Sequence, residues 1–130
     1  MTTTDRRRGL ALAGLAAAAA TLGAAVPALA HSELRTTSPA AGATLKSLPA
    51  TVTLTFGAPL GKAGAVKVTH NRKGNLLKGV RLAPRDARRV VITLKRPGPK
   101  AQNGTYRIAW NATSADGHPE KGLLVFRVRR

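Results

Sequence analysis

The sequence has no cysteine, and its single methionine is the initiator, Met1. Without cysteine the chain can form no disulfide and can offer no thiolate to Cu(I) or zinc. Once the initiator is removed, it offers no thioether either. Any metal site in the processed chain must therefore use nitrogen and oxygen ligands, which suit Cu(II) better than Cu(I).

Acidic residues and aromatic residues are also scarce. The chain has 5 Asp and Glu against 22 Lys and Arg, and outside residues 1–30 there remain 19 basic against 4 acidic residues, a net charge of +15. Such a charge attracts polyanions such as nucleic acid, acidic glycans and anionic lipid. The basic residues are scattered, and the few aromatics form no platform for stacking bases. We therefore expect no nucleic-acid partner, and at most a weak attraction to an anionic cell envelope.

Residues 1–30 have the pattern of an export signal. Arg6, Arg7 and Arg8 form a positive start, an Ala-rich apolar run extends from Gly9 to Val26, and Ala28-Leu29-Ala30 is a cleavage site. The apolar run is long enough to be considered as a membrane anchor. Its modest hydrophobicity and its end at Pro27 favour cleavage instead. Arg7-Arg8-Gly9-Leu10-Ala11 also looks like a twin-arginine signal, which carries folded cargo. Cleavage between Ala30 and His31 would release a periplasmic, extracellular or cell-envelope protein.

The processed chain, residues 31–130, alternates apolar and polar residues in several short runs. Period-2 alternation with turn residues between the runs predicts an all-β, antiparallel sandwich or small barrel of about seven strands. Tyr106 and Trp110 share a strand face with Ile108 and are expected in the core, and residues 71–75 are expected to form a hairpin-like loop. The strands are expected at 33–37, 51–56, 65–70, 76–82, 89–94, 105–113 and 122–129.

The connection Ser114-Ala115-Asp116-Gly117-His118-Pro119 places a carboxylate and an imidazole two residues apart. In an extended backbone, side chains at i and i+2 point to the same side, so both groups could reach one metal ion. Asp116 could instead cap the turn before Gly117. His118 could instead be a loop histidine held by a backbone carbonyl.

Cleavage after Ala30 would make His31 the N-terminal residue. Its free amine and its ring Nδ1 can then chelate one metal ion, although the placement of His31 could be an accident of where the signal ends. Together with Asp116 and His118 this gives three nitrogens and one oxygen, a set that suits tetragonal Cu(II). We therefore expect one Cu(II) per processed chain, held by His31, Asp116 and His118. The remaining histidine, His70, is expected to be a surface residue.

The processed chain resembles the CopC-type copper-resistance family over nearly its whole length. That family has a small Greek-key β-barrel or sandwich, immunoglobulin-like, and binds Cu(II) through a terminal His amine and ring with an Asp and a His of the S-A-D-G-H segment. The resemblance implies the same roles for His31, Asp116 and His118. It rests on His31, Thr37-Ser38-Pro39-Ala40-Ala41-Gly42-Ala43, Val52-Thr53-Leu54-Thr55-Phe56, Gly104-Thr105-Tyr106, Trp110, residues 114–119 and Gly122.

The chain departs from this family's pattern at two places. Many members have a Met-rich Cu(I) site, which this chain lacks. Many also carry an acidic residue after the strand that ends at Phe56, where this chain has Gly57-Ala58-Pro59. Ala58 in that place would weaken Cu(II) binding or open the site to an exogenous ligand.

The resemblance implies an exported Cu(II)-binding protein for buffering, resistance or delivery to a membrane copper transporter of the CopD type, and no enzyme. Two alternatives stay open, one of which uses the same residues. A basic β-sandwich could bind anionic envelope polymers without copper. A terminal-His copper site also resembles that of lytic polysaccharide monooxygenases, but a domain of this size leaves little room for a broad substrate face.

Overall fold

The computed structural model describes residues 32–130, and these form eight strands and one short 3-10 helix. The predicted signal and His31 lie outside the described residues. No helix within 32–130 has the length and apolar character needed to cross a membrane. The elements are β1 (Leu34–Ser38), β2 (Thr44–Leu45), β3 (Thr51–Phe56), β4 (Leu60–His70), β5 (Leu77–Ala83), β6 (Asp86–Leu94), η1 (Pro99–Ala101), β7 (Gly104–Ser114) and β8 (Pro119–Val128).

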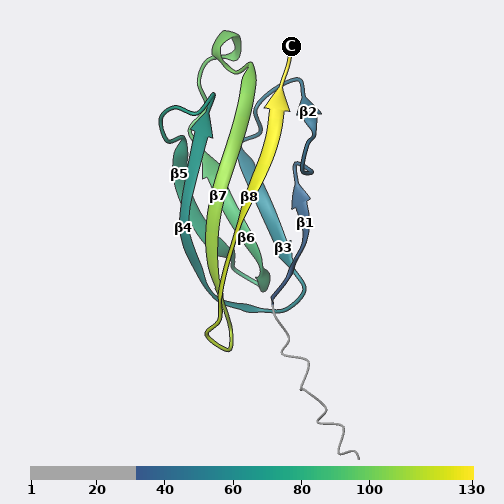
Figure 1. Ribbon diagram of the computed structural model, residues 1–130, viewed down its shortest axis with the longest axis vertical. Coiled ribbons are helices and arrows are strands. Elements are labelled where there is room, and N and C mark those ends of the chain that lie inside the picture. Colours follow the sequence, from purple (N-terminus) through teal and green to yellow (C-terminus); the bar gives the residue numbers. More distant parts are fainter. Residues whose placement is uncertain (1–31) are drawn as a thin grey trace, which may run out of the picture.

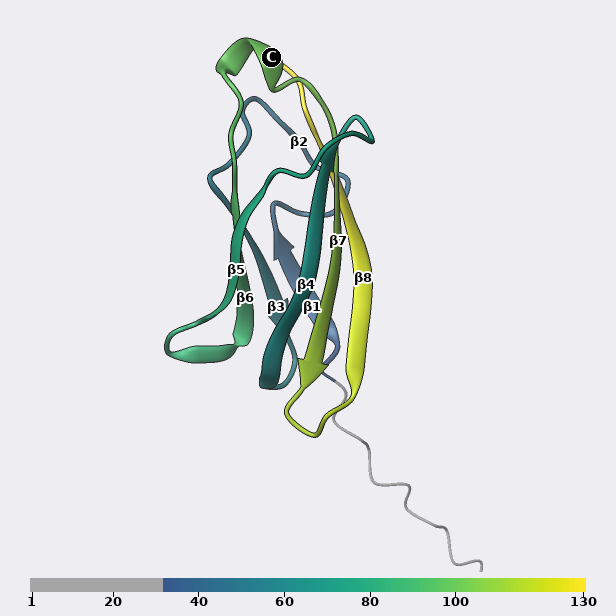
Figure 2. The same cartoon turned by 90° about the vertical axis from the view of Figure 1, so that its left-hand side faces the viewer.

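The strands form two four-stranded sheets that pack face to face (Figures 1 and 2). One sheet has the order β1-β3-β6-β5 and the other the order β2-β8-β7-β4. All pairings are antiparallel except that of the two-residue β2 with β8. Only β5–β6 and β7–β8 are joined within one sheet, and the other connections cross between sheets as in Greek-key sandwiches. The predicted all-β sandwich is confirmed, with β2 as an additional short strand.

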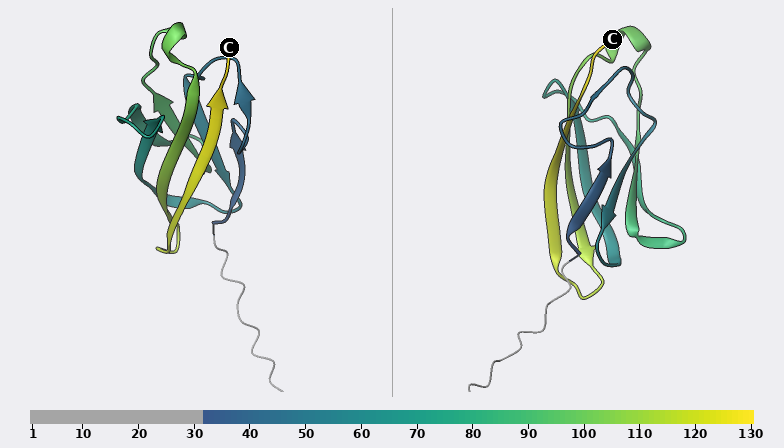
Figure 3. Two further views of the ribbon diagram at one scale, coloured as in Figure 1. Left: turned by 45° about the horizontal axis from the view of Figure 1, so that its top comes forward. Right: turned by 90° about the vertical axis from the view of Figure 1, so that its right-hand side faces the viewer.

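The two ends of the sandwich carry different connections. In Figure 1 the lower end has the start of β1 and the β3–β4, β5–β6 and β7–β8 connections. The upper end has the β4–β5 connection, η1 and the C-terminus, which lies opposite the β7–β8 loop (Figure 3). These two sets of connections define the lower end and the upper end of the sandwich.

The core is built from the inward positions of both sheets, as the alternation predicts. Each large apolar side chain buried there contributes roughly 1.5–3 kcal/mol relative to exposure. Tyr106 and Trp110 are buried as expected, and Phe56 contacts the Trp110 ring edge-on at a centroid distance of 5.3 Å. The buried apolar residues are Leu48, Val52, Leu54, Phe56, Leu60, Val66, Val68, Val90, Ile92, Leu94, Tyr106, Ile108, Trp110, Ala112, Leu124, Phe126 and Val128.

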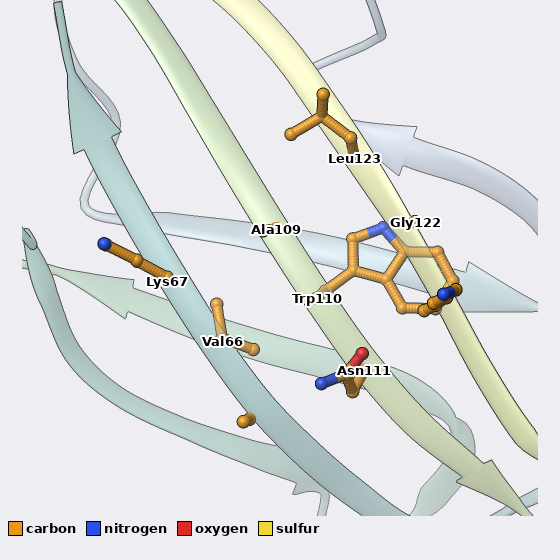
Figure 4. Close-up of a pocket in the computed structure, with 9 residues that line it drawn as sticks. Val66, Lys67, Ala109, Trp110, Asn111, Gly122 and Leu123 are labelled. Carbon is orange, nitrogen blue, oxygen red and sulfur yellow. The ribbon is translucent and has the colours of Figure 1, made fainter. Parts of the chain in front are cut away.

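The indole of Trp110 lies against Gly122, its cross-strand partner on β8 (Figure 4). A methyl group at Gly122 would lie 2.5 Å from Cζ2 of the indole, so only glycine leaves room for this ring. The close approach explains why a glycine stands inside a strand that is otherwise suited to side-chain pairing.

Strand β4 begins five residues earlier than predicted, at Leu60 rather than Ala65. Its pairing with β7 is shifted between Leu60 and Lys62 and again between Ala63 and Val66. These bulges break the apolar–polar alternation, which is why the start of the strand does not show in the sequence.

The predicted hairpin-like loop at 71–75 is only partly correct. His70 and Lys73 exchange backbone hydrogen bonds of 3.1 and 3.0 Å around a tight turn, as in a hairpin. The chain then leaves this sheet, because β5 pairs with β6 in the other one. Local turn chemistry therefore predicts the reversal but not the partner of the strand that follows.

A buried glutamine fastens the upper end. The side chain of Gln102 accepts a hydrogen bond from the Leu48 N–H at 2.8 Å and donates one to the Pro97 carbonyl at 3.0 Å. The Tyr106 hydroxyl donates to the Gln102 carbonyl at 2.6 Å, an arrangement similar to the tyrosine corner of immunoglobulin-like domains. Burial raises the pKa of the Tyr106 hydroxyl, so it stays a donor.

Candidate metal centre

The β7–β8 loop is a tight turn closed by its own backbone. The Ser114 N–H donates to the His118 carbonyl at 2.9 Å, and the Gly117 N–H donates to the Ser114 carbonyl at 2.9 Å. Gly117 has a φ of +90°, in the left-handed region that glycine adopts without strain. The turn therefore needs glycine between the two predicted metal ligands.

Asp116 and His118 lie side by side in this loop. Asp116 Oδ2 is 3.0 Å from His118 Nδ1, and the two side chains are 43% and 47% exposed, respectively. A dissolved ion can therefore reach both groups directly.

Ser114 fixes the positions of Asp116 and His118 through hydrogen bonds. It is the last residue of β7, and its side chain is buried. Its hydroxyl donates to the Asp116 carboxylate and accepts the His118 N–H at 2.9 Å. The hydrogen bond from Ser114 and, next, that from His118 hold the pKa of Asp116 at about 2, below its ordinary 3.8. Asp116 is therefore an anion over the whole physiological pH range.

The separation of the two side chains suits a shared metal ion. Metal–oxygen and metal–nitrogen bonds of about 2.0–2.2 Å, set at a right angle, place two donor atoms about 2.8–3.1 Å apart. Asp116 Oδ2 and His118 Nδ1 already have this separation. An ion that enters between them would replace the hydrogen bond between them, so protons and the ion compete for the two donor atoms and binding there weakens in acid.

The described N-terminus, Ser32, reaches the same end of the sandwich. Its buried side chain donates from Oγ to the Pro59 carbonyl at 3.2 Å. The same carbonyl accepts the N–H of Ala115, in the β7–β8 loop, at 3.2 Å. Ser32 and the loop are therefore joined through one backbone oxygen.

The β3–β4 connection, residues 57–59, also lies at the lower end, next to the β7–β8 loop. It carries no carboxylate. Ala58 is half-buried there, between Gly57 and Pro59. A methyl group at Gly57 would lie 2.6 Å from Nε of Arg35, so a guanidinium covers this connection. The Arg35 guanidinium therefore lies close to Ala58, the position where the family resemblance implies an acidic residue. Its positive charge disfavours binding of a divalent cation at this end.

The structure thus brings together two of the three predicted ligands, Asp116 and His118. The third, His31, lies outside the described residues, and 32–130 contain no group of three or more His, Cys, Asp or Glu that could hold a metal ion. The expectation that His70 is a surface residue is only partly correct. His70 is half-buried at the upper end, stacks on Tyr106 at 4.5 Å and has Nε2 2.8 Å from the Asn103 carbonyl.

Sequence reasoning missed the supporting residues of this site, Ser114 and Ser32. For Ser114 a signal was available. The inward alternation Tyr106, Ile108, Trp110, Ala112 continues to position 114, which predicts a buried hydroxyl two residues before Asp116. For Ser32 no pattern was available, because its partner is the backbone of Pro59, 27 residues away.

Fold and site define the class of this protein: an immunoglobulin-like β-sandwich with a carboxylate–imidazole pair on an end loop. A sequence model of the CopC domain matches residues 34–129. The chain belongs to the CopC domain family.

Relatives differ in how much of their length this domain occupies. The chain is 32% identical over 113 residues to copper resistance protein C of Xanthomonas campestris pv. juglandis, covering 82% of this chain and 86% of that protein. It is 32% identical over 101 residues to copper transport protein CutJ of Bacillus subtilis, covering 76% of this chain but only 18% of CutJ.

A solved structure agrees with these matches. The crystal structure of PcoC, a methionine-rich copper resistance protein from Escherichia coli, has a TM-score of 0.60 and 31% identity, covering 77% of this chain and all of that one (100%). Residues 32–130 of this chain contain no methionine, so the two proteins differ in composition where their folds agree.

Proposed function

We propose that this chain is an exported Cu(II)-binding protein that holds one ion at its lower end. The ligands are the amine and Nδ1 of His31, a carboxylate oxygen of Asp116 and Nδ1 of His118. The observation that carries the proposal is the Asp116–His118 pair, with donor atoms 3.0 Å apart, beside the anchored Ser32.

Ser32 supports a role for His31 through chain geometry alone. Consecutive Cα atoms are 3.8 Å apart. Ser32 is tied to the Pro59 carbonyl, which also binds the loop of Asp116 and His118. The anchored Ser32 therefore supports His31, the residue directly before it in the chain, as the source of the remaining two donor atoms.

The donor set favours Cu(II) over Cu(I). Nitrogen and oxygen donors suit Cu(II), whereas Cu(I) prefers the sulfur ligands that the processed chain lacks. Ligands from the protein fill most of a tetragonal site, which favours binding over catalysis. The chain therefore acts as a carrier or buffer, not an enzyme, in the periplasm, outside the cell or in the envelope.

A membrane copper transporter is the proposed recipient. In Bacillus subtilis a matching segment makes up 18% of a protein named copper transport protein CutJ. A domain that is fused to a transport protein in one organism is expected to meet such a protein as a separate partner in another. Exposed ligands at the end of the sandwich leave room for direct transfer.

The test is a Cu(II) titration of the processed protein that starts with a free His31 beside the same protein with an acetylated N-terminus. Blocking the amine chelate should weaken Cu(II) binding about a hundredfold, since two of four donors lose their geometry. Intact mass must first establish the N-terminus of the exported protein. Equal affinity in the two proteins would refute the role of His31.

A further inference from the structure

A groove lined by arginines lies at the upper end, on the outer face of the β2-β8-β7-β4 sheet. It has a volume of about 270 Å³ and is lined by Asn71, Arg72, Thr105, Arg107, Val125 and Arg127. Thr105 pairs with Arg127, and Arg107 pairs with Val125, across β7 and β8. Arg107 and Arg127 are thus diagonal neighbours, with Cβ atoms about 7–8 Å apart.

The turn after β4 adds the third arginine. Asn71 and Arg72 have φ values of 50° and 66°, as in the hairpin turns that favour Asn-Gly. The side chain of Asn71 fixes this turn to β7, because its Oδ1 accepts the Thr105 N–H at 2.9 Å. At Arg72 the left-handed conformation costs about 1–2 kcal/mol that glycine would avoid. Arg72 thus occupies a position where the left-handed backbone favours glycine, so local stability does not explain its side chain.

A second groove continues the first. It has a volume of about 340 Å³, shares Thr105 and Arg127 with the first, and adds Arg129. The two together form a continuous path along the edge of the upper end, from Arg72 to Arg129. A path of this kind suits a chain with repeated negative charges better than a single small ion.

Within residues 32–130, no acidic side chain forms an ion pair with these arginines. Among residues 32–130 the one ion pair of a Lys or Arg is Arg89–Asp86, at 3.4 Å. The four acidic residues of this part of the chain are Glu33, Asp86, Asp116 and Glu120. They stand before β1, at the start of β6, in the β7–β8 loop and near the start of β8, all at the lower end (Figure 1).

We propose that this arginine groove binds a base-free phosphodiester polymer, with Arg72, Arg107 and Arg127 as the principal contacts. Guanidinium groups bind phosphate through paired N–H donors, and several along one path match a polymer that repeats the phosphate. The Phe, Tyr and Trp side chains, Phe56, Tyr106, Trp110 and Phe126, are all buried, and no aromatic ring lines the groove, so it offers bases no ring to stack on. The groove is separate from the copper site and its occupation needs no metal.

The test measures binding of fluorescently labelled poly(glycerol phosphate) to the exported protein at several salt concentrations. The triple variant Arg72→Gly, Arg107→Gln, Arg127→Gln should bind at least tenfold more weakly, and the dependence of log affinity on log salt should fall by about one for each lost arginine. The matched control is Lys62→Gln, Arg81→Gln, Arg88→Gln, which removes the same charge from exposed positions outside the groove. The control should keep most of the affinity.

The single variant Arg72→Gly separates binding from folding. It should raise the melting temperature, because glycine relieves the left-handed backbone, and still weaken polymer binding. Equal losses in the two triple variants would mean that net charge alone attracts the polymer, and would overturn the proposal. Tighter binding of a carboxylate polymer such as poly-glutamate, of oligo-dT, or of phosphatidylglycerol vesicles would overturn the assignment of the ligand. No binding at 50 mM salt would overturn it as well.

Discussion

The β7–β8 hairpin runs through both ends of the sandwich and carries different chemical groups at each. At the lower end its loop exposes a carboxylate and an imidazole 3.0 Å apart. At the upper end the same strands carry a half-buried Arg107 and an exposed Arg127, and neither forms an ion pair among the described residues. The comparison shows that the acidic residues of 32–130 gather at one end of the sandwich, whereas basic residues lie at both.

The histidines repeat this contrast. His118 is nearly half exposed, in a loop, next to a carboxylate. His70 is half-buried, stacks on Tyr106 and contacts the Asn103 carbonyl. One is available to a metal ion, and the other contributes to packing, so equivalent substitutions at the two should have opposite consequences.

The largest expected effect follows from removing the imidazole at the lower end. His118→Ala should weaken Cu(II) binding about a hundredfold or more, because it removes a direct ligand. Its unfolding free energy should change little, since the side chain is exposed. His70→Ala is the matched variant. It should keep the Cu(II) affinity and lose about 1–2 kcal/mol of stability. Isothermal titration measures the Cu(II) affinity of both variants, and urea unfolding measures their stability. A reduced copper affinity of the His70 variant would contradict the contrast between the two histidines.

The next effect concerns the upper end. Tyr106→Phe removes the hydroxyl that bonds the Gln102 carbonyl and leaves a buried acceptor unsatisfied. The unfolding free energy should fall by about 1–3 kcal/mol, measured by urea unfolding. Cu(II) affinity should stay the same, because the lower end makes no use of this bond. Unchanged stability would show that water replaces the hydroxyl.

A smaller effect is expected from the support of the ligand pair. Ser114→Ala removes the hydrogen bond that contributes most to the low pKa of Asp116. The pKa of Asp116 should rise from about 2 toward 3.8, as followed by NMR of its side-chain carbon. Cu(II) affinity should fall about tenfold, the usual result of losing a group that orients a ligand. Ser47→Ala, at an exposed position of the upper end, is the control and should change neither quantity.

This lowered pKa also fixes a pH dependence. A carboxyl group whose pKa is lower in the folded chain stabilises it fully above the unfolded value, near 3.8, and loses this contribution as the pH falls through about 2. Urea unfolding of the parent protein should show this loss in acid. Ser114→Ala should show less of it, and an identical acid profile in both proteins would contradict the assigned cause.

The smallest expected effect concerns the β3–β4 connection, which lacks a carboxylate. Ala58→Glu should strengthen Cu(II) binding by about 1 kcal/mol, or roughly fivefold, because it places a negative charge near the ion and opposite Arg35. Ala101→Glu adds the same charge at an exposed position of the upper end. It should leave the copper affinity unchanged, because charges so far apart are screened by salt. Equal gains in both variants would mean that total charge, not position, limits binding.

Sequence alone predicted most of the fold because, in a strand with one buried face, apolar and polar residues alternate with period 2. Residues 51–56 alternate without interruption, and β3 has these bounds. The alternation failed at Leu60 to Ala65, where two bulges shift the register. It also gave no information on which sheet β5 joins, because the tight turn at 70–73 looks the same in both topologies.

The candidate site was predictable to the extent that it lies in one stretch. Asp116 and His118 are two residues apart, and their proximity follows from local geometry. The hydrogen bond of Ser32 to Pro59 joins distant segments through a backbone carbonyl, which no residue pattern encodes. The arginine groove was missed for the same reason, since Arg72, Arg107 and Arg127 meet only when β4, β7 and β8 are side by side.

The paired ladder of β7 and β8 runs without a register shift from Gly104 and Val128 to Thr113 and Pro119. At about 3.3 Å per residue it is a stiff spacer of roughly 25 Å between the arginines and the loop. A molecule held by its upper end would present the proposed metal ligands, Asp116 and His118, at this distance from its attachment. A transfer partner could then approach the ion head-on without first displacing the protein from its attachment. Attachment and metal exchange would thus proceed in any order.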